Sequence, residues 1–379
     1  MKIIIFGLGN NPVIDAVKIV WPDNHIQVLK NIKSDQQLLV KYSDSLPFIE
    51  NLTQSDVLFT ESKSFLPTSA SHIENNYVDF DMDLLMPHML SNLSPKIVKG
   101  DVNNDGADDF FLLQSHGYSN KLFINSKSGF KESIQNSFKQ NREKESTAGA
   151  LFDADGDKDL DLIVGMGGNE FKRGGDNFFA EFYKNDGKGN FTPEQLKGVR
   201  IMGQISCIKP IDFDLDGDLD LFLGGQSVPG GYGLVPRSYM LKNNGNGMWE
   251  DITNNNTGPI GMVSDAVWSD VNNDKLPDLI VVGEWMPVKV FINENGFFDA
   301  PKILPGSAGW WNCIDANDID NDGDMDYLLG NYGLNMKFKA SEQKPFNMYV
   351  SDLDNNGRTD VILEWFTSED SKPYPFASK

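Results

Sequence analysis

The feature that most constrains this chain is an aspartate-rich nonapeptide that occurs six times. One copy, DIDNDGDMD, runs from Asp318 to Asp326 and carries an acidic residue at every second position. At about 4–5 Å and an effective dielectric constant of about 20, each pair of carboxylates repels by roughly 3–4 kcal/mol. A folded chain can hold these charges together only if something offsets the repulsion.

The six copies are spaced as the repeats of a modular β fold. Their first aspartates stand 34 to 59 residues apart, at Asp101, Asp153, Asp212, Asp270, Asp318 and Asp352. Such intervals are typical of propellers, solenoids or arrays. Each copy leads into a short apolar run such as LIVG or LIVVG, and several continue into an aromatic-rich strand and an Asn/Gly turn, as in EFYKNDGKGNF. These are hairpin signals.

The repeats therefore predict an all-β protein in which small antiparallel sheets of about four strands are arranged radially. That architecture is a β-propeller of four-stranded blades, with six loops visible here and a seventh blade expected in the intact propeller. A β-solenoid is the alternative, but it favours shorter and more uniform repeats. Helical periodicity is confined to SIQNSFKQNREKES.

The first 75 residues differ from the repeats. Residues 1–45 alternate between apolar and polar side chains, which predicts a small β domain with a hairpin turning at residues 22–24 and a further strand over residues 36–42. Residues 46–75 are polar and contain Pro47 and Pro67, which predicts a linker. The propeller is then expected to occupy residues 76–379.

The nonapeptide has the chemistry of a cation loop. Positions 1, 3, 5 and 9 carry side-chain oxygens in every copy, and a tight loop that turns these side chains inward surrounds a cation with hard ligands, as Ca²⁺ requires. We expect four to six calcium ions. The predicted ligands are Asp101, Asn103, Asp105 and Asp109; Asp153, Asp155, Asp157 and Asp161; Asp212, Asp214, Asp216 and Asp220; Asp270, Asn272, Asp274 and Asp278; Asp318, Asp320, Asp322 and Asp326; and Asp352, Asp354, Asn356 and Asp360.

The nonapeptide has alternatives to a calcium loop. An EF-hand needs a bidentate glutamate at position 12, where all six copies have leucine or valine. Solvated surface turns and Mg²⁺ remain alternatives to Ca²⁺. Position 6 is glycine in four copies, which indicates a backbone that glycine adopts most easily. Lys158 and Lys275 replace that glycine, so we expect strain or weaker binding in those two loops.

Composition excludes several partners. The net charge of −22 argues against nucleic acid and against anionic membrane surfaces, and no apolar run is long enough for a transmembrane helix. The only two cysteines, Cys207 and Cys313, each precede a motif by five residues. Because equivalent positions in non-neighbouring blades lie too far apart for a disulfide, we predict two free, buried thiols.

The motifs resemble a known family. The six loops resemble the calcium loops of FG-GAP/VCBS repeats, the units of the integrin α-subunit propeller. Residues 7–42 resemble the ASPIC/UnbV domain, as found in bacterial relatives of cartilage acidic protein. In that family the ASPIC/UnbV domain follows a propeller. The resemblance therefore implies that this chain holds the end of one such domain and the start of a second propeller, as part of a longer polypeptide.

Calcium loops and the resemblance together predict a calcium-stabilised extracellular or cell-surface module that binds a glycan or a protein. The alternatives are a polysaccharide lyase or hydrolase, which a Lys/Arg–Tyr or carboxylate cluster away from the calcium loops would favour, and a structural spacer. No catalytic residue is predicted. Candidate binding features are an exposed Trp310–Trp311 pair and two glycine-bearing loops, one with Lys172 and Arg173 and one over residues 224–239.

Overall fold

The computed structural model describes residues 11–21, 25–34, 36, 38–42, 65–83, 85–245, 247–253, 257, 259–336, 338–357, 359–366 and 372–376. The chain forms two compact units, Met1–Lys63 and Ser64–Lys379. The predicted turn at residues 22–24 and most of the predicted linker lie outside the described residues.

The first unit contains the predicted hairpin. β1 (Val13–Val20) pairs antiparallel with β2 (Ile26–Lys33), and Val20 lies opposite Ile26. The further strand predicted over residues 36–42 is wrong for the residues described there, which form no strand. Leu39 in this apolar run is 64% exposed. It is therefore not packed on a sheet face, which is what would have stabilised a third strand.

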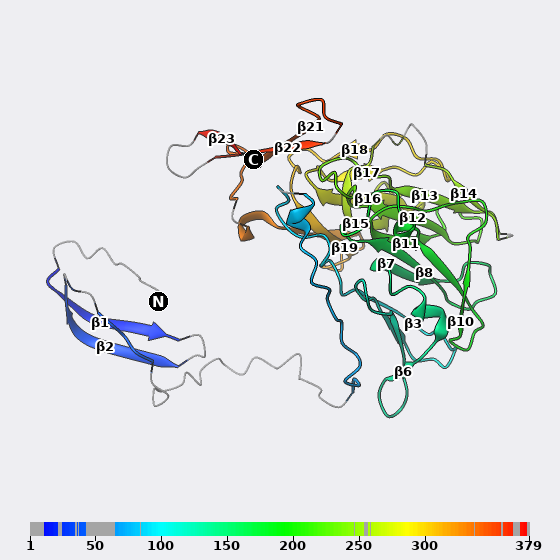
Figure 1. The fold of residues 1–379 in the computed structure, drawn as a ribbon, viewed down its shortest axis with the longest axis horizontal. Helices are drawn as coiled ribbons and strands as arrows, with labels where there is room; N and C mark the ends of the chain where they lie inside the picture. The colour runs from blue at the N-terminus through cyan, green and yellow to red at the C-terminus, as the bar shows by residue number, and fades with distance from the viewer. Residues whose placement is uncertain are drawn as a thin grey trace. The chain divides into compact units, whose positions relative to one another are not determined.

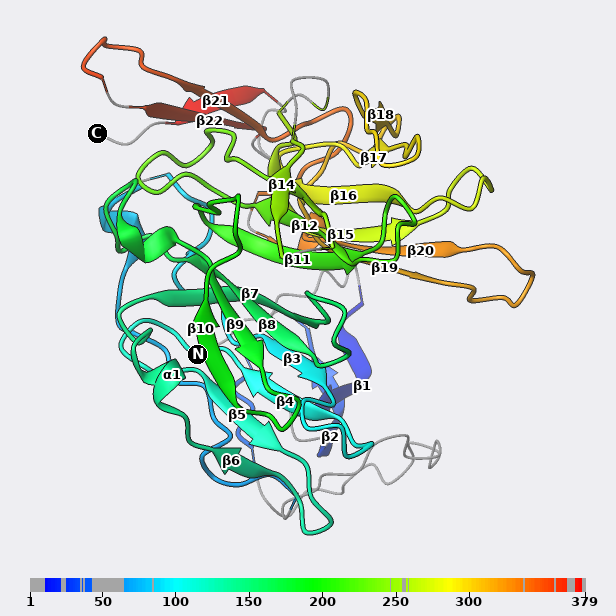
Figure 2. The same cartoon turned by 90° about the vertical axis from the view of Figure 1, so that its right-hand side faces the viewer.

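The second unit is built of antiparallel sheets whose strands follow one another in chain order, as predicted (Figures 1 and 2). Each of the first four sheets has four strands, and we call them blades 1 to 4. Their strands are β3 (Ile97–Gly100), β4 (Asp109–Leu112), β5 (Lys121–Ile124) and β6 (Lys131–Ser133); β7 (Glu145–Phe152), β8 (Asp161–Gly167), β9 (Glu181–Asn185) and β10 (Phe191–Glu194); β11 (Ile205–Ile211), β12 (Asp220–Gly225), β13 (Tyr239–Asn243) and β14 (Trp249–Asp251); and β15 (Met262–Ser269), β16 (Asp278–Glu284), β17 (Lys289–Phe291) and β18 (Lys302–Ile303).

Two smaller sheets, blades 5 and 6, complete the second unit. They consist of β19 (Trp311–Asn317) and β20 (Asp326–Asn331), and of β21 (Asn347–Ser351), β22 (Asp360–Phe366) and β23 (Pro373–Phe376). Helix is scarce in the described residues: α1 (Asn136–Lys139) and the 3₁₀ turns η1 (Asp79–Asp81), η2 (Asp176–Phe178) and η3 (Gly333–Asn335). None of these helices has the length or the apolar character needed to cross a bilayer.

The core lies in layers between neighbouring blades. The second strands β8, β12 and β16 are buried along their whole length, because each is covered on both faces. The first strands β3, β7, β11, β15 and β19 are successive neighbours (Figure 2). One apolar cluster joins blades 1 and 2, and others join blades 2 and 3, blades 3 and 4, and blades 4 and 5. This is an all-β propeller architecture, in which no strand pairing among the described residues closes the blades into a ring.

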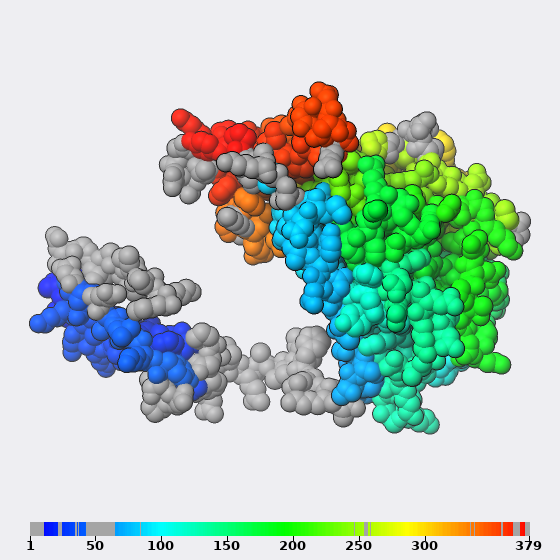
Figure 3. Space-filling model, in the orientation of Figure 1, coloured from blue at the N-terminus to red at the C-terminus, as the bar shows by residue number. Residues whose placement is uncertain are grey.

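Each blade has two structurally different ends. The nonapeptide is the turn between the first and second strands, and we call that end the loop end. The opposite end, where first strands begin and second strands finish, we call the pocket end. Residues 65–83 and 85–96 run along the blades (Figure 3), and these residues form no strand. Ser115 Oγ donates to the Ile73 carbonyl, and Asn169 Nδ2 donates to Asp83 Oδ2 at 2.9 Å. The part of the predicted linker over residues 65–75 thus contacts blade 1, and the segment that follows it contacts blade 2.

Candidate metal loops and pockets

The six loops share one hydrogen-bonding scheme. The position-1 carboxylate accepts the N–H of position 6 at 2.7–3.1 Å, and the position-9 carboxylate accepts the N–H of position 2 at 2.8–3.4 Å. In the first loop these donors are Gly106 and Val102. The aspartates therefore shape the loop backbone themselves, as side chains do in Asx turns.

The loop backbone is left-handed at two positions. At position 6 the four glycines have φ of 81–100°, and Lys158 and Lys275 have φ of 74° and 73°. The structural basis of the glycine preference is thus confirmed, and both lysines adopt a backbone that L-residues rarely favour. Position 4 is also left-handed in every loop, with φ of 58–77°. The sequence signal for position 4 was its asparagine in four of six copies, and Leu215 is the one apolar residue there.

Four loops gather three acidic side chains whose oxygens lie within 4.8 Å of one another. In three of these the residues occupy positions 1, 3 and 9, and in the second loop they occupy positions 1, 3 and 5. The groups are Asp153, Asp155 and Asp157; Asp212, Asp214 and Asp220; Asp318, Asp320 and Asp326; and Asp352, Asp354 and Asp360. Loops 1 and 4 carry Asn103 and Asn272 at position 3, and each amide donates to the position-5 aspartate.

The position-9 aspartates are buried in blades 1 to 4. Their second oxygen accepts the N–H of an asparagine at the end of the third strand, for example Asn243 on Asp220 at 2.8 Å. Burial raises the pKa of Asp161 to about 6 and that of Asp220 to about 7. Each of these carboxylates thus links three strands, and a metal would have to share its oxygens with backbone donors.

Two lysines that the sequence did not reveal as part of the loops lie against the carboxylates of loops 2 and 3. Lys184 Nζ contacts Asp155 and lies 3.3 Å from Asp157, and Lys242 Nζ contacts Asp214 and lies 3.4 Å from Asp216. Hydrogen bonding to Asp155 and to Asp214 raises the pKa of the two lysines. The signal was a Lys-Asn pair ending the third strand, where loops 1 and 4 have Ile-Asn.

These contacts test whether the loops fit a cation. Positions 3 and 5 present oxygens that already attract an ammonium group, and Asp214 Oδ1 is buried without a hydrogen-bond partner. All the donors are oxygens, the set that hard cations prefer. Four of the loops thus have the oxygen set that could hold a hard cation such as Ca²⁺ or Mg²⁺, with the lysines as competitors in loops 2 and 3.

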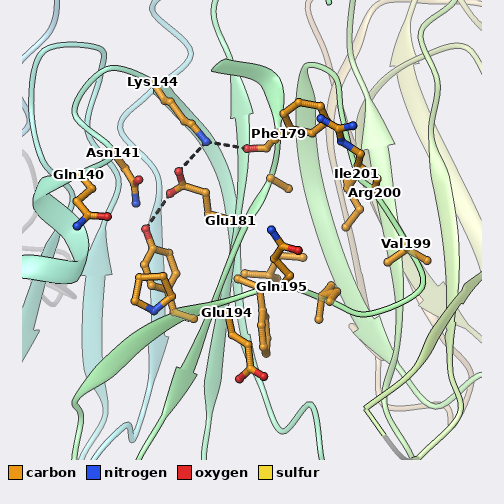
Figure 4. A pocket seen from close by; sticks show the side chains of 16 residues that line it. Gln140, Asn141, Lys144, Phe179, Glu181, Glu194, Gln195, Val199, Arg200 and Ile201 are labelled. Atoms are coloured by element: carbon orange, nitrogen blue, oxygen red, sulfur yellow. Dashed lines mark hydrogen bonds and ion pairs between the residues drawn. The ribbon is translucent and has the colours of Figure 1, made fainter. Parts of the chain in front are cut away.

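A pocket of about 740 Å³, the outer pocket, lies at the pocket end of blade 2 (Figure 4). Lys144 Nζ pairs with Glu181 Oε1 at 2.7 Å, and the Tyr183 hydroxyl donates to Glu181 Oε2 at 2.8 Å. Burial raises the pKa of Tyr183. On the other side, the Arg200 guanidinium lies 3.9 Å from the centre of the Phe179 ring. Charged and aromatic groups thus face the same pocket.

A second pocket of about 430 Å³, the inner pocket, is lined by residues of four first strands and of the segment before β3. His88 lies at this pocket, with Nε2 2.8 Å from Glu284 Oε1. The Tyr232 hydroxyl donates to the other Glu284 oxygen at 2.7 Å. Burial would lower the pKa of His88, but the hydrogen bond and charge of Glu284 outweigh it and raise the pKa. The loop over residues 224–239 therefore packs into the pocket end, whereas Lys172 and Arg173 are exposed.

Two predictions about exposure are wrong. Trp310 is only 7% exposed, because it packs against Trp285 and His88, and Trp311 is half-buried with its Nε1–H on the Ser307 carbonyl. Both cysteines are free, as predicted, and Cys207 is buried.

Cys313 is exposed, contrary to prediction. Its neighbour Ile314 points the other way, into the cluster between blades 4 and 5. Cys207 instead faces the apolar cluster between blades 3 and 4. Cys207 and Cys313 occupy equivalent positions in their blades. They differ in exposure because the neighbouring sheet covers Cys207 and does not cover Cys313.

Comparison with known proteins agrees with the geometry. The FG-GAP-like repeat family matches residues 101–164 and 270–329, and the ASPIC and UnbV family matches residues 2–47. No curated protein matches the chain.

Similar solved structures are distant. The biofilm matrix protein Bap1 of V. cholerae has 15% identity and a TM-score of 0.34, over 75% of this chain and 39% of Bap1. BBS1N, in complex with ARL6DN, has 12% identity and a TM-score of 0.37, over 75% and 82%. YCF48, bound to D1 peptide, has 9% identity and a TM-score of 0.35, over 74% and 76%. The chain thus spans less than half of Bap1, and similarities this low assign no ligand.

Proposed function

We propose that this chain, an FG-GAP-repeat β-propeller with an ASPIC/UnbV domain, is a calcium-stabilised extracellular or cell-surface module that binds a glycan or a protein. In general terms, FG-GAP propellers are binding or adhesion modules. The observation that carries the calcium proposal is the gathering of three acidic oxygens in four of the six loops. The twenty-four oxygen-bearing residues named above are the proposed ligands.

Calcium would act on stability through mass action. At a free concentration ten times the dissociation constant, one site contributes about 1.4 kcal/mol, and six sites contribute on the order of 8 kcal/mol. That sum is comparable to the whole net stability of a domain. Sites of the affinity of extracellular modules, roughly 10⁻⁴–10⁻³ M, would be filled outside the cytosol.

The outer pocket keeps a polysaccharide-active enzyme as the second candidate, because it brings Lys144, Tyr183 and Arg200 together away from the metal loops. Binding is the better supported function. The Tyr183 hydroxyl and Lys144 are both engaged with Glu181, and the raised pKa of Tyr183 is unfavourable for a general base.

The test is thermal unfolding in millimolar calcium and in excess chelator, with calorimetric calcium titration. We expect a fall in melting temperature of more than about 10 °C on chelation, and four to six ions bound. Asp320→Asn should remove or weaken one ion, whereas the exposed Asp299→Asn should remove none. An unchanged melting temperature with no ion bound would overturn the calcium proposal. Glycan and protein arrays probed with the calcium-loaded chain then test the binding role.

A further inference from the structure

The inner pocket is formed by one repeated irregularity of the first strands. In β7, β11, β15 and β19 the ladder skips one residue, and the skipped residues are Thr147, Ser206, Ser264 and Asn312. Each stands six residues before the first aspartate of its loop. A bulge re-aims a side chain, and all four of these polar side chains line the inner pocket. Four successive blades thus contribute the same structural position to one cavity.

The hydroxyl groups of this set form a chain of bonds between blades that stops at blade 4. Thr147 Oγ1 donates to the Ile205 carbonyl of the next blade at 2.7 Å, and Ser206 Oγ donates to the Val263 carbonyl at 2.6 Å. The next member is Ser264, whose Oγ is buried and has no partner among the described residues. Buried polar groups are nearly always hydrogen-bonded. Ser264 Oγ is therefore available to a ligand in the pocket.

A cation without a carboxylate partner faces the same cavity. Lys96 Nζ donates to the Ser206 carbonyl and forms no ion pair with any described residue. Burial lowers its pKa. The acidic loops lie at the other end of the blades. The carboxylates near Lys96 are engaged elsewhere: Asp265 pairs with Lys209 at 2.8 Å, and both oxygens of Glu284, which lines the pocket, are hydrogen-bonded to His88 and Tyr232. A half-buried lysine with spare donors favours an anionic group on whatever fills the pocket.

The rest of the lining indicates what carries that anion. Amide groups of Asn92, Gln226 and Asn312 line the pocket beside the hydroxyls, and the Tyr332 ring lies at the same cavity. The volume of about 430 Å³ exceeds what a bare phosphate or sulfate fills and falls within the roughly 300–1,000 Å³ of small-molecule sites. Hydroxyl and amide groups in one cavity suit a ring with many hydroxyls.

We infer that the inner pocket binds a uronic acid, with Lys96 on the carboxylate and Ser264, Asn312 and Gln226 on the ring hydroxyls. This inference rests on the proposed function, because it specifies the class of glycan that the module binds. His88 is held by Glu284 and by the Met89 carbonyl, so it shapes the wall of the pocket.

The test is binding of sodium D-glucuronate and of D-glucose to the calcium-loaded full chain, followed by saturation-transfer NMR and calorimetry. We expect saturable glucuronate binding and at least about 10-fold weaker binding of glucose, the effect of one charge-assisted contact. Lys96→Met should weaken glucuronate binding by about 10-fold or more, and Ser264→Ala by several-fold. The control Lys144→Met, in the outer pocket, should leave it unchanged.

Three results would overturn the inference: no saturable glucuronate binding, equal affinity for glucose, or full competition by inorganic sulfate at equal concentration. If Lys96→Met fails to fold, the affinity of Ser264→Ala for glucuronate and the affinity of the wild type for glucose still test the inference. The calcium proposal fails separately. A chain that binds glucuronate but shows no calcium-dependent melting temperature loses only the calcium proposal, and a calcium-stabilised chain that ignores glucuronate loses only the uronate site.

Discussion

The loop end and the pocket end of the blades hold acidic side chains in opposite ways. At the loop end, aspartates are gathered in threes, most of them in contact with solvent, and backbone N–H groups orient them. At the pocket end, glutamates are withdrawn from solvent, and the neighbouring Glu145 and Glu170 repel each other. Burial raises the pKa of Glu145 to about 9 and that of Glu170 to about 7, and each has one oxygen without a described partner.

The two ends avoid the free-energy cost of a desolvated charge by different means. At the loop end the charge remains, and a cation can neutralise it from solvent. At the pocket end, Glu145 and Glu170 favour the protonated form, whereas Glu284 receives hydrogen bonds on both oxygens. Cation dependence is therefore expected of the loop end and proton dependence of the pocket end.

The largest effect is expected for Asp220→Asn, because Asp220 is a loop-end residue that is buried like the glutamates of the pocket end. Both Asp220 oxygens accept backbone N–H groups, so an amide nitrogen would face a donor. We expect a loss of about 3 kcal/mol in urea unfolding with chelator, and a larger loss with calcium, where the variant also lacks a proposed metal ligand. Asp299→Asn, an exposed control, should be neutral. A loss seen only with calcium would mean that Asp220 acts through the metal.

The proton dependence of the pocket end can be isolated with Glu145→Gln. Because the folded-state pKa is raised above the ordinary 4.5 to about 9, the folded chain holds a proton that the unfolded chain releases. Stability from this group is therefore complete below about pH 4.5 and is lost as the pH rises toward 9. We expect the wild type to lose about 2 kcal/mol more between pH 5.5 and pH 7 than Glu145→Gln. The exposed Glu143→Gln should keep the wild-type slope, and parallel slopes for wild type and Glu145→Gln would contradict this account.

Within the loop end, Lys242→Met tests whether the ammonium group of Lys242 competes with a metal ion for loop 3. Removing the cation that contacts Asp214 and Asp216 frees both carboxylates. We expect one ion to bind about 5-fold more tightly by calorimetry, the equivalent of about 1 kcal/mol for a partly exposed pair. Lys188→Met, on an exposed turn outside the loops, should change nothing. Weaker binding in Lys242→Met would show that the lysine supports the loop and does not compete.

The smallest effect concerns the backbone of loop 3. Leu215 has φ of 60° and is 59% exposed. Its left-handed conformation is therefore unfavourable, and burial of the side chain does not offset that cost. Leu215→Asn should stabilise the chain by about 0.5–1 kcal/mol in chelator, since asparagine tolerates this region better. Leu353→Asn, at an exposed leucine outside the left-handed positions, should give no gain. Equal effects at both sites would rule out the backbone explanation.

The blades and their loops could be predicted because their signals are local. The order of strands, the nonapeptide turn, the left-handed position 6 and the short helix near Phe138 all follow from spacing and residue type within about 60 residues. The N-terminal hairpin likewise follows from alternation. The strand expected over residues 36–42 was wrong because an apolar run needs a face to pack on, and alternation alone does not supply one.

The sequence by itself determined that this chain is an array of β blades with an oxygen-lined loop on each, because those features need only neighbouring residues. The tertiary structure decided everything that depends on which blade lies beside which. It buried Trp310, left Cys313 exposed, brought Lys184 and Lys242 onto carboxylates of their loops, and turned four bulged residues into one pocket. The burial and the partners of a side chain depend on contacts with residues far away in the sequence. Local sequence patterns do not specify those contacts.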